Sequence, residues 1–114
     1  MWRSTQPTRE SRGKEEAMAT FVSLVNWTDQ GIRNITDTIQ RYERGEEIAN
    51  KYGVRNEQIY WTVGPYDMVF IAQAPDVESI TAYLLEVGSA GNIRTTTLRG
   101  YNREEMSGIL ERLG

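Results

Sequence analysis

The sequence contains no cysteine and no histidine among its 114 residues. These absences exclude thiol and imidazole nucleophiles, Ser-His-Asp triads, zinc sites built on thiolate or imidazole, and disulfide bonds. No apolar run approaches the roughly 20 residues of a membrane-spanning helix. The 13 basic and 16 acidic residues give a net charge of -3, without the basic excess typical of nucleic-acid binding. We therefore expect neither a membrane nor a nucleic-acid partner.

Residues 1–17 differ in composition from the rest of the chain. Their only large apolar side chains are Met1 and Trp2, too few to bury the surface that an ordered segment needs. They also lack the apolar stretch of a secretory signal. The prediction is a disordered N-terminal extension over 1–17, one domain over 18–114 and a cytoplasmic location.

The remaining residues predict alternating strands and helices. Runs rich in β-branched and aromatic residues predict strands over 19–27, 58–63, 67–74 and 93–99. Helical spacing of apolar residues predicts helices over about 36–52, from Asp76 to Gly88, and after Asn102. Asp29 to Gly31 is predicted to end the first strand. Asp76 is the expected N-cap of the second helix, and Asn102 with Glu105 resembles a capping box.

The order of these elements is strand-helix-strand-strand-helix-strand with a terminal helix. It predicts an α+β, ferredoxin-like βαββαβ fold with a four-stranded antiparallel sheet and a C-terminal helix. The first strand is apolar on both alternating sets, so an uncovered sheet face would leave a large apolar patch in water. We therefore expect a homodimer that packs sheet to sheet, with Val25 and Trp61 as interface positions.

Three segments resemble the GYD domain proteins: ATFVSLVNWTDQGIRNI at 19–35, YWTVGPYDMVFIAQAPD at 60–76 and GSAGNIRTTTLRGY at 88–101. The Gly-Tyr-Asp signature corresponds to Gly64, Tyr66 and Asp67, with Pro65 between the first two. The resemblance covers about 18–114 and implies a dimeric α/β barrel. That architecture is related to antibiotic-biosynthesis-type monooxygenases, muconolactone isomerase and the effector-binding domains of leucine-responsive regulators. It implies no particular activity.

Tyr66 and Asp67 at the predicted hairpin are the candidate catalytic residues. Tyr66 would donate a hydrogen bond, and Asp67 would act as a general base if burial raised its pKa. The structural alternative is that Asp67 caps the turn through backbone N–H groups while Tyr66 packs over the strand end.

Two further groups are candidate ligand-binding residues. Trp27, Tyr60 and Trp61 could line an apolar pocket, or serve core and dimer packing. Thr95, Thr97 and Arg99 share one strand face and could bind a carboxylate or phosphate, or form an ordinary edge strand. We predict no metal site and no cofactor.

These features favour a homodimeric small-molecule-binding or assembly module that takes a small apolar or anionic ligand. The alternative is a cofactor-independent enzyme, of isomerase or monooxygenase type, acting on a small aromatic or polyketide-like substrate in the barrel. The sequence leaves open whether the protein is an enzyme.

Overall fold

The computed structural model describes residues 18–114, and the extension predicted over 1–17 lies outside the described residues. The strands are β1 (Ala19–Trp27), β2 (Arg55–Trp61), β3 (Met68–Ala74) and β4 (Ile93–Gly100). The helices are α2 (Asp29–Arg33), the 3-10 turn η1 (Ile35–Asp37), α3 (Thr38–Lys51), α4 (Val77–Ser89) and α5 (Arg103–Glu111). None of these helices is long and apolar enough to cross a membrane.

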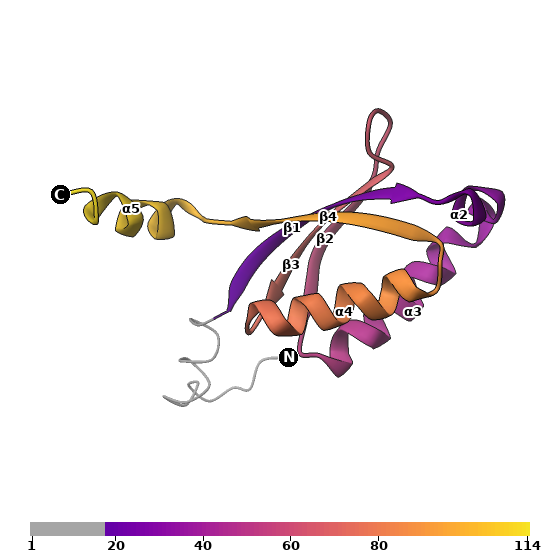
Figure 1. Cartoon of the computed structure of the whole chain (residues 1–114), viewed down its shortest axis with the longest axis horizontal. Helices are drawn as coiled ribbons and strands as arrows, with labels where there is room; N and C mark the ends of the chain where they lie inside the picture. The colour runs from indigo at the N-terminus through magenta and orange to yellow at the C-terminus, as the bar shows by residue number, and fades with distance from the viewer. Residues whose placement is uncertain (1–17) are drawn as a thin grey trace, which may run out of the picture.

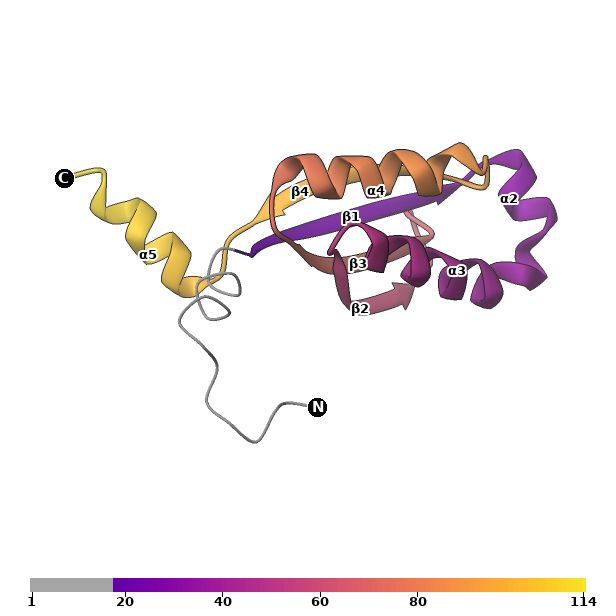
Figure 2. The same ribbon diagram turned by 90° about the horizontal axis from the view of Figure 1, so that it is seen from below.

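The strands form one antiparallel sheet in the order β2-β3-β1-β4. Helices α3 and α4 lie side by side on one face of this sheet, and no described helix lies on the other (Figures 1 and 2). This arrangement confirms the predicted α+β, ferredoxin-like βαββαβ fold with a C-terminal helix.

The predicted helix caps are present. The Asp76 carboxylate accepts the Ser79 N–H at 2.7 Å and begins α4. At α5, the Asn102 side chain accepts the Glu105 N–H at 2.8 Å while the Glu105 carboxylate accepts the Asn102 N–H at 2.9 Å. The two reciprocal bonds satisfy N–H groups that have no partner inside the helix.

The first strand ends at Trp27, as predicted, but the short helix α2 that follows was not predicted. The Thr28 hydroxyl accepts the Gly31 N–H at 3.0 Å and caps this helix. A Cβ on Gly31 would lie 2.0 Å from the Asn92 carbonyl oxygen, so only glycine permits this close approach. Strand β2 begins and ends earlier than predicted, with a register shift between Asn56 and Gln58.

The face under the helices carries the core. Val25 is 0 % exposed and pairs with Met68 on one side and Thr95 on the other. Trp61 pairs with Met68 and therefore points to the same side. The prediction that Val25 and Trp61 lie on an outward face was wrong, because both sets of β1 are apolar and the sequence does not specify which of them the helices cover.

The opposite side of the sheet is called here the open face. Its apolar side chains are half-buried or exposed and come from all four strands: Val22, Leu24, Tyr60, Val69, Ile71 and Leu98. The β2–β3 hairpin rises beyond this side, and α5 stands away from both the sheet and the other helices (Figures 1 and 2). The chain thus leaves two apolar surfaces, the open face and α5, without a covering layer among its described residues.

Candidate functional site

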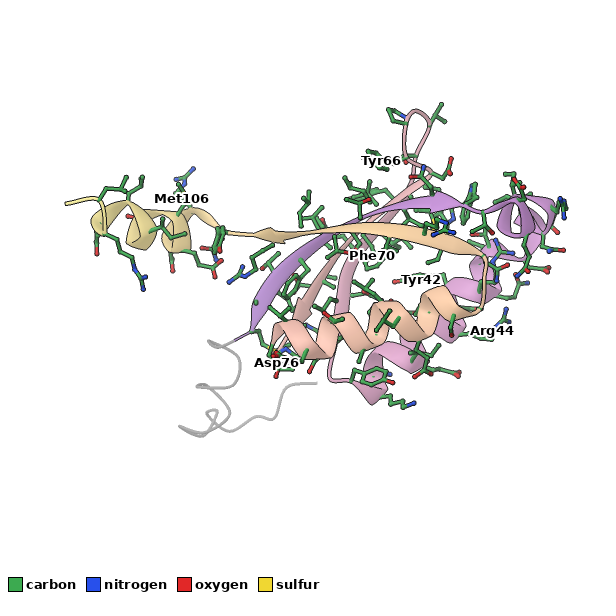
Figure 3. The ribbon with its side chains drawn as sticks, in the orientation of Figure 1. Tyr42, Arg44, Tyr66, Phe70, Asp76 and Met106 are labelled. Atoms are coloured by element: carbon green, nitrogen blue, oxygen red, sulfur yellow. The ribbon has the colours of Figure 1, made fainter. Side chains whose placement is uncertain are left out.

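A cavity of about 170 Å³ lies between the helix-covered face of the sheet and helices α3 and α4. Phe70 and Tyr42 point into this layer from the sheet and from α3 (Figure 3). The walls also include Val25, Ile48, Met68, Val87 and Ile93. An apolar cavity of about 150 Å³ is large enough for benzene. The space therefore suits a small apolar or aromatic group.

The cavity exists partly because α3 carries a glycine where it faces the sheet. Gly45 is buried, and a Cβ built on it would lie 4.0 Å from the Tyr83 hydroxyl. A larger side chain at this position would grow into the space in front of Tyr83. Gly45 thus keeps open a gap that most residues at a core-facing helix position would fill.

Two tyrosine hydroxyls supply polar groups within the cavity wall. Burial, with the nearby Glu46 carboxylate, raises the pKa of Tyr42 to about 12, and the Tyr42 hydroxyl lies 3.3 Å from that carboxylate. Burial also raises the pKa of Tyr83. The Tyr83 hydroxyl accepts a 3.1 Å hydrogen bond from Asn56 Nδ2, and the Asn56 Oδ1 atom is buried without a partner. Both phenols therefore remain protonated at neutral pH and can act as hydrogen-bond donors.

The cavity wall also carries charged side chains. The Arg41 guanidinium donates to the backbone carbonyls of Asn34 at 2.6 Å and Gly31 at 3.2 Å, and it lies 5.7 Å from the Trp27 ring centre. Arg44, one residue before Gly45, is exposed. Glu86 accepts hydrogen bonds from Tyr52 and Lys51, which lower the pKa of its carboxyl group. Because the Arg41 guanidinium already donates to two backbone carbonyls, Arg44 is the cavity-lining cation best placed to meet an anionic ligand.

The predicted pair Tyr66 and Asp67 lies at the hairpin and does not line the cavity. The Asp67 carboxylate accepts the Trp27 N–H at 2.9 Å, and the Asp67 N–H donates to the Val25 carbonyl at 2.8 Å. The Thr62 hydroxyl donates to the Tyr66 carbonyl at 2.6 Å. Gly64 adopts φ +134°, which favours glycine in this turn. These contacts tie the hairpin to the end of β1, and a catalytic role for the pair remains a prediction.

The three predicted aromatic residues do not share one pocket. Trp27 lines the cavity. Trp61 lies beside it, edge-on to Tyr42 at 6.1 Å between ring centres, and its Nε1 donates to the Thr38 hydroxyl at 3.0 Å. Tyr60 lies on the open face, because neighbouring residues of a strand point to opposite sides.

Thr95, Thr97 and Arg99 do share the covered face, but none of them lines the cavity. The Thr97 hydroxyl lies 2.8 Å from the Ser23 hydroxyl. The Arg99 guanidinium lies 4.4 Å from the Tyr101 ring centre and 3.4 Å from the Glu105 carboxylate. Arg99 is therefore engaged at the joint between β4 and α5.

Sequence analysis missed most of the cavity wall. Tyr42 and Tyr83 lie within the helices predicted over 36–52 and from Asp76 to Gly88, but sequence analysis did not connect them with a site. The available signal was Gly45 in the middle of a predicted helix, where glycine is unfavourable and often has a packing reason.

The fold and this site define a small ferredoxin-like α+β domain with an apolar cavity under its helices and a sheet face that no described residue covers. Residues 21–110 match the GYD domain. Because that match spans most of the chain, the protein belongs to the GYD domain family.

One curated relative matches most of the domain. The chain is similar to a protein of Thermus thermophilus called "Glutamine synthetase and cystathionine beta-lyase binding protein". The two are 33% identical over 82 residues, which cover 71% of this chain and 86% of the relative.

Solved transcription regulators share the fold. The leucine response regulatory protein of Mycobacterium tuberculosis matches with a TM-score of 0.58 and 18% identity over 90% of this chain and 61% of its own. An AsnC family regulator from Agrobacterium tumefaciens matches with a TM-score of 0.53 and 13% identity over 89% of this chain and 60% of its own. The chain spans about three fifths of each regulator, and at these identities the similarity concerns the fold alone.

Proposed function

We propose that this protein is a homodimeric binding module, in which two copies pack through their open faces and each holds a small ligand in the cavity under its helices. The observation that carries the proposal is the open face itself. Its apolar side chains come from every strand and have no covering layer among residues 18–114. Contiguous apolar patches of this kind on soluble domains mark interaction sites.

A sheet face suits a second copy of itself. The centre of the open face is a cluster of five aliphatic side chains with Tyr60 beside them, and polar residues such as Gln73, Arg94 and Thr96 surround it. An apolar centre with a polar rim can meet the same surface related by a two-fold axis. The cores of homodimer interfaces are more apolar than other protein surfaces. A dimer formed in this way would bury Leu24, Ile71 and Leu98 together.

The ligand part of the proposal rests on the cavity. Its volume of about 170 Å³ and its apolar wall favour a small aromatic or branched aliphatic body. The exposed Arg44 favours an anionic group, such as a carboxylate, at one end of that body. A small aromatic carboxylate combines these properties.

We propose that this binding module also binds other proteins. The Thermus thermophilus relative is named for binding two enzymes, which supports protein partners for this chain as well. We also propose that the protein is located in the cytoplasm. The enzymatic alternative has less support, because the Asp67 carboxylate holds a backbone N–H of β1 outside the cavity.

The dimer is tested by sedimentation velocity of the full chain and two leucine variants. Leu98 is 50% exposed on the open face, and Leu85 is 69% exposed on the outer side of α4. We expect the wild type and Leu85→Asp to sediment as dimers and Leu98→Asp to sediment as a folded monomer. A monomeric wild type, or a Leu98→Asp dimer as stable as the wild type, would contradict the proposed interface.

The cavity is tested by an NMR titration with benzoate as the probe and benzyl alcohol as its uncharged counterpart. We expect benzoate to shift the amide signals of α3 and α4, and Arg44→Ala to weaken benzoate but not benzyl alcohol. Gly45→Leu, which fills the space in front of Tyr83, should remove both responses. The absence of cavity shifts with either probe would overturn the ligand site.

A further inference from the structure

Helix α5 is well defined at its start although it stands away from the sheet and the other described helices (Figures 1 and 2). The reciprocal hydrogen bonds between Asn102 and Glu105 form a complete capping box. Arg99, at the end of β4, pairs with the Glu105 carboxylate at 3.4 Å and lies against the Tyr101 ring. These contacts orient the first turn of α5 relative to β4.

The apolar side of α5 has no surface to pack against within the described residues. Its stripe consists of Met106, Ile109 and Leu110 and is continued by Leu113 just after the helix, and Leu110 is 51% exposed. The helix has nine residues, whereas isolated helices shorter than about 12 residues are marginal in water. A helix with this pattern is stabilised mainly by packing its apolar face. Another surface must therefore cover the stripe.

The number of residues on the open face favours a second copy of this chain as the surface that covers the α5 stripe. Half of the residues in the four strands, about fifteen, point to the open face because neighbours alternate. A stable interface contains about 20–30 residues on each side. The sheet alone falls short of that range, and the four residues of the α5 stripe would bring the total close to its lower end. Only two residues separate α5 from β4, which is an edge strand of the same sheet. The helix therefore lies next to the proposed open-face interface and can enlarge it.

We propose that α5 is an arm that packs its apolar stripe on a second copy of this chain. The inference rests on the homodimer proposed above and adds a segment to it. Two-fold symmetry makes the exchange reciprocal, so that each copy gives one arm and receives one. The dimer is then held by two kinds of contact, sheet on sheet at the centre and an arm at each end.

The experiment uses the absence of natural cysteine to place one thiol at a chosen site. Ser107→Cys lies on α5 beside the stripe, and Ser89→Cys at the end of α4 is the matched control. Each variant is coupled to a benzophenone maleimide. Unlabelled chains are then mixed and refolded with chains carrying a heavy nitrogen isotope, irradiated, and digested for mass spectrometry. Crosslinked peptides of mixed isotope can arise only between two copies.

We expect mixed-isotope crosslinks from Ser107→Cys and only background from Ser89→Cys. In the unmodified chain, Leu110→Asp should raise the Kd of the dimer at least about tenfold, because it removes the burial of a leucine in each arm. Leu85→Asp should leave that Kd unchanged.

Other results would test the proposed arm and the proposed dimer independently of each other. Same-isotope crosslinks alone would show that α5 packs on its own chain, residues 1–17 included, and would overturn the arm. A dimer that Leu98→Asp dissociates but that gives no crosslink from Ser107→Cys would support the open-face interface and overturn the arm, leaving α5 for another protein. A monomeric wild type would overturn both proposals. Mixed crosslinks in a dimer that Leu98→Asp does not weaken would support the arm and overturn the open-face contact.

Discussion

On strand β1, Val25 lies fully buried beneath α3 and α4, while Val22 points to the side on which residues 18–114 place no helix. The two valines have the same chemistry and lie three positions apart, yet one belongs to the core and the other to a surface. The covered face also holds small residues, Ala72 and Ala74, where the helices approach closely. The open face instead keeps branched aliphatic side chains half-buried. This contrast indicates that the first face is completed within the chain and the second requires another layer.

The largest expected effect comes from exchanging these two valines for aspartate. Val25→Asp places a carboxylate in the core and should cost about 4 kcal/mol or more, a large share of the 5–15 kcal/mol that stabilises a domain. Val22→Asp should leave the chain folded and abolish the dimer. Circular dichroism during heating and sedimentation velocity measure the two effects. If both variants unfold alike, the open face is as deeply packed as the covered one and the contrast fails.

A smaller effect is expected at the hairpin, which is tied to the end of β1 by Asp67. Asp67→Ala leaves the Trp27 N–H without its acceptor and should lower the free energy of unfolding by about 1–3 kcal/mol. Asp67→Asn keeps a side-chain oxygen at the same position and should cost less. Urea denaturation of the two variants provides the comparison. Equal losses would mean that the negative charge stabilises the hairpin and that the hydrogen-bond acceptor does not.

The N-caps of α4 and α5 allow a comparison between a helix that packs on the sheet and a helix that packs on none of the described residues. Asp76→Ala should lower the free energy of unfolding by about 1 kcal/mol, or the Tm by about 4–8 °C, because α4 belongs to the core layer. Asn102→Ala should melt α5 without changing that Tm when it is made in monomeric Leu98→Asp. Amide hydrogen exchange resolves the two helices. An equal fall in Tm for both caps would show that α5 packs on its own chain.

The smallest expected effect concerns how the stability of the covered face depends on pH. Burial raises the pKa of Tyr42 from 10.0 to about 12, so the folded chain holds this proton after the unfolded chain has released it. The contribution of Tyr42 to stability is therefore present below pH 10 and is lost as the pH rises to about 12. The ultraviolet absorbance of tyrosinate should show a late-titrating phenol that Tyr42→Phe removes. An unchanged late phase would place the raised pKa on another tyrosine.

Much of the fold followed from local patterns, and parts of the site did not. The strand runs, the Asp76 cap and the Asn102–Glu105 capping box were predictable because each depends on residues close together in the sequence. The grouping of Trp27, Tyr60 and Trp61 was wrong, and alternation along the strand predicted over 58–63 was enough to place Tyr60 and Trp61 on opposite sides. The cavity depends on Gly45 of α3 meeting Tyr83 of α4, two residues that no local spacing connects.

Composition and short-range spacing were enough to predict the order of the strands and longer helices, the helix caps, the family and the apolar side chains on both sides of the sheet. Which side the helices cover, and with it the burial of Val25 and the exposure of Leu98, became clear from the folded chain alone. The tertiary structure also decided that α5 projects from the domain and that a cavity remains in front of Gly45. The physical reason is that covering a face, leaving a gap and directing a helix are properties of surfaces brought together by the chain, and alternation along one strand is the same for either side.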